Sequence, residues 1–164
     1  MTQQTLARIR TQIERMRALA RSPEAQLCAR QERISAWSPA EHLDHMYKVS
    51  MSIVRRITEE GAKPSRRGIN FMGRAVLLLG WIPRGRGKTP ERLSGAVCTG
   101  AHIEASLGRL EQALDTLPVD AVDSSRLPIV PHPFFGGLTP SQALRFIVIH
   151  TKHHQRIIDE ILAR

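Results

Sequence analysis

Apolar residues recur every three or four positions over four long stretches of the chain, which is the spacing of amphipathic helices. We therefore expect long helices over residues 2–22, 38–60, 103–117 and 139–164. The first helix would bury Leu6, Ile9, Ile13, Met16 and Leu19, and the third Ile103, Leu107, Leu110 and Leu114. No segment shows strand-like alternation, and there is no internal repeat.

Two of these helices begin with the same local signal. Ser38-Pro39-Ala40-Glu41 and Thr139-Pro140-Ser141-Gln142 each place a hydroxyl at the N-cap, proline at the first helical position and Glu or Gln at the third. This arrangement predicts a capping box on a helix that proline has already started. Gly61 suits the C-terminal stop of the second helix.

The pattern predicts an all-α fold, a four-helix bundle in a single domain over residues 1–164. Residues 61–94 form a long crossover between the second and third long helices, with one extra short apolar helix over residues 71–81. The crossover is long enough to return the chain along the bundle, which permits these two helices to run parallel.

Composition excludes several other classes of protein. Of the 164 residues, 41% are apolar and 24% charged, which is ordinary for a globular domain and unlike a disordered, collagen-like or disulfide-stapled chain. The formal net charge is +9. Aromatic residues are scarce at 4%, whereas there are seven histidines, a residue able to bind metal or carry protons near neutral pH.

The cysteines and the apolar segments indicate a compartment. Cys28 and Cys98 form no CxxC pair, and we interpret them as free thiols in a reducing environment. The first 22 residues lack the apolar core of a secretory signal. Residues 71–82 are interrupted by Arg74 and are too short to span a bilayer. We expect a cytoplasmic protein with no membrane partner.

The last helix has histidine at two of its five core-stripe positions. His150 and His154 are four residues apart and only ~40° apart around the helix, so both rings can reach one point. The alternative is a pair of core histidines hydrogen-bonded to backbone or neighbouring side chains. A metal needs a further ligand, and His42 and His45 on the second helix are the other pair. The apolar stripe of that helix favours His42 without deciding between them.

The residues around these histidines resemble a known family over most of the chain. The stretch 37–46, WSPAEHLDHM, followed by HTKHH at residues 150–154, resembles the DinB-like metal-binding helical bundles. In that family a tryptophan precedes the second helix and the first ligand histidine follows eight positions later, which selects His45. The other two ligands correspond to His150 and His154. Residues 89–91 and 132–140 fit a branch whose function is unassigned.

The resemblance implies a divalent metal on three imidazoles, with zinc expected and nickel as the alternative. It also implies a homodimer and an activity as a thiol-dependent transferase or isomerase, or as a hydrolase, that activates a low-molecular-weight thiol or water. Three further histidines would flank the metal ligands: His42, His132 and His153. His102 carries no motif of its own.

A basic segment supplies most of the net charge. Residues 61–98 hold eight Lys and Arg and one acid, or 8 − 1 = +7 of the total +9. Arg84, Arg86 and Lys88 lie in a Gly-rich stretch without phosphate-loop spacing. The segment is either a solvated loop, an attractor for a small anionic thiol, or a surface for nucleic acid or membrane. We favour the anionic thiol as partner over nucleic acid, and keep a basic binding module with a structural metal as the alternative function.

Overall fold

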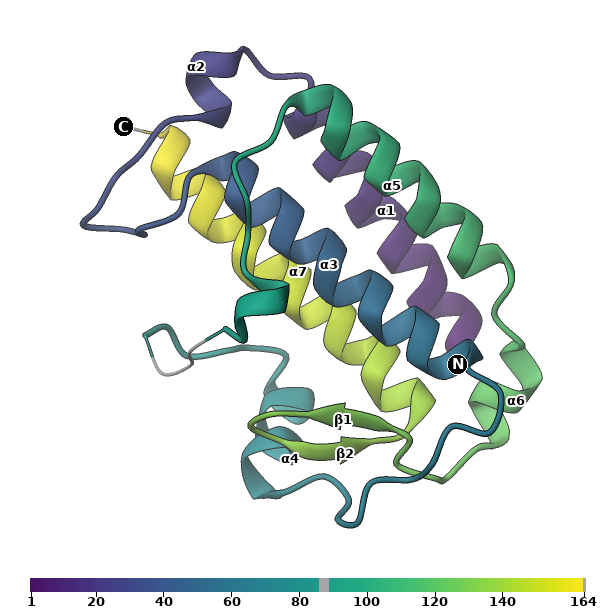
Figure 1. Ribbon diagram of the computed structural model, residues 1–164. Helices are drawn as coiled ribbons and strands as arrows, with labels where there is room; N and C mark the ends of the chain where they lie inside the picture. Colours follow the sequence, from purple (N-terminus) through teal and green to yellow (C-terminus); the bar gives the residue numbers. More distant parts are fainter. Residues whose placement is uncertain (86–88, 164) are drawn as a thin grey trace.

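The computed structural model of the chain describes residues 1–85 and 89–163 and is mostly helical (Figure 1). Arg86 and Lys88, two of the three residues expected to bind substrate, lie outside the described residues. The elements in chain order are α1 (Thr2–Ala20), α2 (Glu24–Leu27), α3 (Pro39–Thr58), α4 (Phe71–Leu79), the 3-10 helix η1 (Glu91–Leu93), α5 (Gly100–Asp115), α6 (Val119–Ser124), β1 (Val130–His132), β2 (Gly136–Leu138) and α7 (Pro140–Leu162).

The four long helices α1, α3, α5 and α7 form the predicted bundle around one hydrophobic core. Both predicted capping boxes are present, at Ser38 and at Thr139, and each satisfies amide groups that a helix start would leave unpaired. The most deeply buried apolar side chains come from all four helices and include Ile9, Leu43, Leu107 and Ile147. The predicted all-α class and its four-helix bundle are confirmed.

The long crossover returns the chain so that α3 and α5 run parallel. Asp44 near the start of α3 meets Ala96, just before α5, and Tyr47 further along α3 meets Arg109 further along α5. Helix α7 runs antiparallel to α3, as the contacts of His42 with His154 and of His45 with His150 show. Figure 1 shows this arrangement, with η1 crossing in front of α3 and α7.

The expectation of no strands was wrong in one place. Val130–His132 and Gly136–Leu138 pair as an antiparallel hairpin, with Val130 opposite Leu138 and His132 opposite Gly136. Strands of three residues are too short to show an alternating pattern, and Pro131 in the first strand argues against a strand by composition. The short elements α2, η1 and α6 escaped prediction for the same reason of length.

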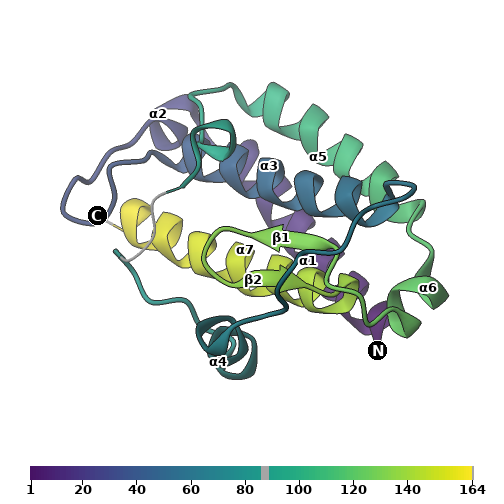
Figure 2. The same ribbon diagram turned by 60° about the horizontal axis from the view of Figure 1, so that its bottom comes forward.

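Helix α4 lies at the margin of the molecule and has two apolar faces (Figures 1 and 2). Its inner face buries Val76 and Leu77, while Phe71, Leu78 and Leu79 on the outer face are 85%, 80% and 70% exposed. The helix ends earlier than predicted, because Gly80 adopts a left-handed conformation with φ +65°. Within the described residues, no helix combines the length and the apolar character needed to cross a bilayer.

Candidate metal centre

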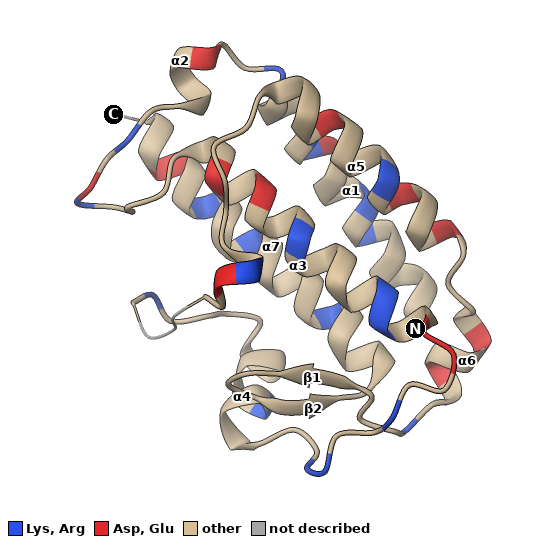
Figure 3. Cartoon of the chain, viewed as in Figure 1, with Lys and Arg blue, Asp and Glu red and all other residues tan. Residues whose placement is uncertain are grey.

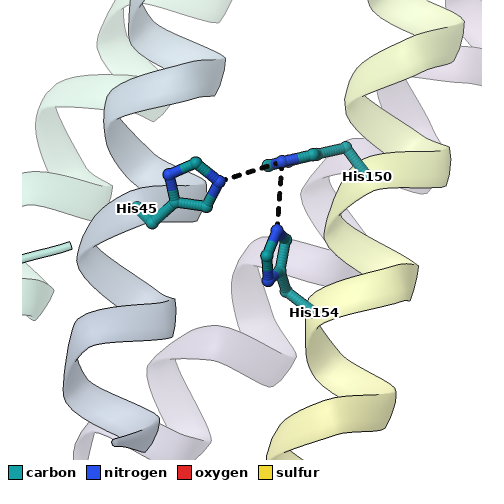
Figure 4. A group of neighbouring side chains, drawn as sticks. All are labelled: His45, His150 and His154. Atoms are coloured by element: carbon teal, nitrogen blue, oxygen red, sulfur yellow. Dashed lines mark hydrogen bonds between the residues drawn. The ribbon is translucent and has the colours of Figure 1, made fainter. Parts of the chain in front are cut away.

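Three histidine side chains from two helices converge in the bundle core. Their Nε2 atoms face one another: His150 Nε2 lies 3.1 Å from that of His45 and 3.1 Å from that of His154 (Figure 4). Ligand atoms of all three lie within 4.8 Å of one another. Tetrahedral coordination with bonds of about 2.0–2.1 Å places ligand nitrogens roughly 3.3 Å apart. The three imidazoles therefore fit a divalent metal ion.

Burial keeps these imidazoles neutral. Desolvation lowers the pKa of His45, and it lowers the pKa of His150 and His154 well below the ordinary value, with the neighbouring histidines adding to the effect. A neutral imidazole keeps a lone pair on one nitrogen, which is the form that binds metal. The three rings are therefore in the protonation state that can bind a metal ion.

The backbone of the crossover fixes the orientation of His45. The Leu93 carbonyl lies 2.5 Å from His45 Nδ1 and can only accept, so the ring carries its proton on Nδ1 and keeps the lone pair of Nε2 free. A ring held by such an outer hydrogen bond is typical of metal-binding histidines.

Residues 93–96 are called the strap. Asp44 and Lys48, which lie on either side of His45 in the sequence of α3, hold the strap in place. Asp44 Oδ2 accepts from the Ala96 amide at 2.8 Å, and Lys48 Nζ donates to the Ser94 carbonyl at 2.9 Å. Asp44 and Lys48 also form an ion pair at 2.8 Å. Asp44 is buried, whereas the Lys48 side chain is partly exposed. The sequence gives no signal for Leu93, because its carbonyl and not its side chain makes the contact.

His42 contacts a candidate ligand and does not itself join the cluster. Its Nδ1 lies 2.9 Å from Nδ1 of His154, and its Nε2 lies 3.0 Å from the hydroxyl oxygen of Ser35. If His154 keeps Nε2 free, its Nδ1–H donates to His42, which then donates from Nε2 to Ser35. His42 thus lies between a candidate ligand and Ser35, a contact that spacing could not reveal.

We expect His42→Ala to weaken metal binding by about 10–100-fold, the usual effect of losing an outer hydrogen bond to a ligand. The variant should still bind metal more tightly than His154→Ala, because Nε2 of His154 remains in place. Competition with a chromophoric zinc chelator measures both affinities. Loss of all metal in His42→Ala, with His45→Ala unaffected, would mean that His42 is the ligand on α3.

The third ring lacks such support. Nδ1 of His150 is buried and has no hydrogen-bond partner among the described residues. An unpaired buried donor costs ~1–3 kcal/mol, so His150 is the costliest of the three to bury. This cost is consistent with a ring kept in place for its Nε2 atom and not for packing.

The other predicted flanking histidines lie further out. His153 follows on α7 and its ring centroid is 5.0 Å from that of His154. His132, the last residue of β1, stacks on Phe135 with ring centroids 4.1 Å apart, and its Nδ1 accepts hydrogen bonds from two backbone amides of the β1–β2 turn. Phe146 lies between His132 and the cluster, since its ring contacts both His132 and His150.

Trp37 and the basic residues complete the surroundings. The indole of Trp37, half-buried, lies over the cluster with ring centroids 5.0 Å from His45 and 6.3 Å from His154. In the sequence Trp37 marks the start of the motif before α3, but no local pattern indicates its contact with the histidines. Arg84 forms a two-pronged ion pair with Glu160 at 2.6 and 2.7 Å, so its charge is already matched.

Three histidines converge from an antiparallel pair of helices in a bundle with a crossover connection. Helical proteins of this class could bind a divalent metal ion. The model of the DinB superfamily matches residues 8–158, and the chain belongs to that superfamily. The predicted family is confirmed. Comparison with curated proteins gave no match, and neither did comparison with solved structures.

Proposed function

We propose that the protein is a metal-dependent enzyme that activates a low-molecular-weight thiol or water at His45, His150 and His154. One observation carries the proposal: the three convergent imidazoles gain no fourth His, Cys, Asp or Glu from the described part of the chain. Three protein ligands with one open position are typical of catalytic zinc sites, whereas structural sites are closed by a fourth. Nickel is the alternative ion, since imidazole suits both.

Zinc with an open position lowers the pKa of a bound thiol or water and so supplies a nucleophile at neutral pH. In this chain, outer hydrogen bonds would hold two of the three rings with Nε2 free. His45 is oriented by the strap and His154 by His42, while Trp37 lies over the rings. The resemblance to thiol-dependent relatives favours a thiol over water as the activated group.

The chain's own Cys98 is a poor candidate for this thiol. Burial, with Asp44 adding to it, raises the pKa of Cys98 to about 11, so the sulfur stays protonated at neutral pH. Its Sγ lies 3.9 Å from the Ala40 carbonyl, a packing contact near the start of α3. We therefore infer that the thiol is a small molecule from solution. The free cysteines fit a reducing compartment, and a cytoplasmic location is part of this proposal.

Metal analysis followed by a conjugation assay tests the function. The protein purified without chelator should contain about one zinc or nickel per chain, and should accelerate the attack of glutathione or a similar thiol on an aryl chloride with release of chloride. The chelated protein should lose this rate and regain it with zinc. Absence of bound metal after purification, or the same rate with and without metal, would contradict the proposal.

The second candidate is a basic module that binds nucleic acid and uses the metal only to tie α3 to α7. The observation in its favour is the segment 61–98, with +7 of the +9 net charge. Residues 61–85 contain no acid, and their Lys and Arg lie on α4 and on the loops before and after it (Figure 3). Tight, salt-sensitive binding of a mixed-sequence duplex without any thiol reaction would favour this module.

We expect metal occupancy to fall as the pH decreases below about 6, because protons compete for the same nitrogens. Burial lowers the pKa of all three histidines, so protonation begins below the ordinary value of about 6.5 and metal is retained through neutral pH. Elemental analysis after dialysis at stepped pH measures the occupancy. Unchanged occupancy at pH 4 would exclude histidine ligands.

A further inference from the structure

A cavity of about 380 Å³ lies on the outer side of α7, against residues 80–84 that follow α4. Its size is that of a small-molecule site. His153 lines the cavity, and its ring is in contact with that of His154. The lining of the cavity therefore touches the histidine cluster through His153.

The charge in this cavity is unbalanced. Lys152 and Arg156 line it one helical turn apart, and neither forms an ion pair within residues 1–85 and 89–163. Like charges four residues apart on a helix repel each other. Glu160 is the acidic residue of the lining, and it is already bound by both guanidinium nitrogens of Arg84. An anionic group placed between Lys152 and Arg156 would relieve the repulsion.

The remaining walls are apolar, so an organic anion suits the cavity better than a bare inorganic ion. Trp81 presents a half-exposed indole on one side, and Ile82 and Ile149 complete the lining. We propose that this cavity binds the carboxylates of the thiol cosubstrate, with Lys152 and Arg156 as the charged contacts. This inference rests on the proposed function, which supplies the thiol. It places the anion contacts on α7 and not in the crossover loop, where the sequence predicted them.

Calorimetric titration with S-methylglutathione tests the cavity without involving a free thiol. The zinc-loaded protein should bind this blocked thiol, and Lys152→Gln combined with Arg156→Gln should weaken binding at least tenfold. Arg145→Gln is the matched control, since Arg145 is exposed on α7 outside the cavity lining. Metal content should be equal in all three proteins.

The outcomes separate this inference from the proposed function. Equal affinity in the wild type and the double variant, or no binding by either, overturns the cavity assignment even if the zinc-loaded protein conjugates thiols. Binding that depends on Lys152 and Arg156 supports the assignment, and it does so even if the conjugation assay fails.

The outer face of α4 carries a second, independent inference. Phe71, Ala75 and Leu78 follow one another at steps of four and three, the spacing of a helix–helix seam, and Ala75 at the centre permits close approach. Together with Met72 and Leu79 they form the apolar patch. A contiguous apolar patch of this kind often marks an interaction site.

We infer that a second copy of the chain covers the apolar patch, with the two α4 helices packed against each other. The exposed parts of Phe71, Met72, Leu78 and Leu79 amount to about 500 Å² if a large apolar side chain counts roughly 180 Å². A symmetric pair would then bury about 1,000 Å², the area that a biological interface is expected to reach.

Light scattering after size-exclusion chromatography tests the interface. The wild type should have twice the mass of one chain, and Leu78→Glu should be monomeric with an unchanged helical spectrum. Leu127→Glu, at an exposed apolar residue outside the apolar patch, should stay dimeric. A monomeric wild type, or a dimeric Leu78→Glu variant, overturns the inference; so does a monomer that binds vesicles of anionic lipid through this face.

Discussion

Replacing any one of His45, His150 and His154 with alanine is expected to lower zinc affinity by about 1,000-fold. The reason is the number of donors: three nitrogens share the whole interaction, and apparent zinc binding energies of about 10–16 kcal/mol leave ~4 kcal/mol for each ligand lost. The fall should exceed that of His42→Ala, because His42 contacts the ring of His154 and not the point where the three Nε2 atoms converge. Chelator competition measures all four affinities.

His102→Ala is the control for this series. His102 is an exposed histidine on α5, and its removal should leave zinc affinity and stability unchanged. Circular dichroism should show the same helix content in every variant, so that loss of metal is not mistaken for loss of fold. Retention of full affinity by any of the three variants would remove that residue from the ligand set.

Gly95→Ala should damage the same site from outside it. A Cβ at this position would lie 2.0 Å from the Glu41 carbonyl oxygen, inside any allowed contact, and the obstacle is backbone that cannot rotate away. The strap must then move off α3, which withdraws Leu93 from His45. We expect a loss of about 1–3 kcal/mol in unfolding free energy and a fall of about 10–100-fold in zinc affinity.

Gly108→Ala provides the matched control, because a Cβ there meets nothing within 4 Å and the residue lies inside α5. Alanine should stabilise that helix by about 0.5–1 kcal/mol. Chemical denaturation and zinc titration of the two variants separate stability from affinity. If Gly95→Ala is destabilised but binds zinc as tightly as the wild type, the Leu93 contact does not orient His45.

The long helices could be predicted because their signals are local and repeated. The capping boxes at Ser38 and Thr139 and the apolar spacing along 20-residue stretches mark each helix several times over. The β1–β2 hairpin and η1 have three residues per element, too few for any period to appear. The parallel course of α3 and α5 depends on packing between distant residues, and the sequence could only permit it.

The histidine side chains of the candidate site could be predicted from the sequence, but the backbone contact that orients His45 could not. His150 and His154 are visible from spacing, but periodicity favoured His42 over His45, and the resemblance reversed that choice. The geometry shows why the two were hard to separate: both rings are buried against α7, one facing Nε2 of His150 and the other Nδ1 of His154. No sequence pattern indicates that the Leu93 carbonyl contacts His45.

The division of the three histidines between α3 and α7 also sets an order of events during synthesis on the ribosome. His45 and His150 are 105 positions apart, so His45 emerges and can settle beneath its strap long before its partners exist. The nascent chain offers an ion only one imidazole of the set until α7 has left the exit tunnel. Full loading with metal is therefore among the last steps of maturation, and a ribosome that stalls before residue 150 releases a chain unable to assemble the centre.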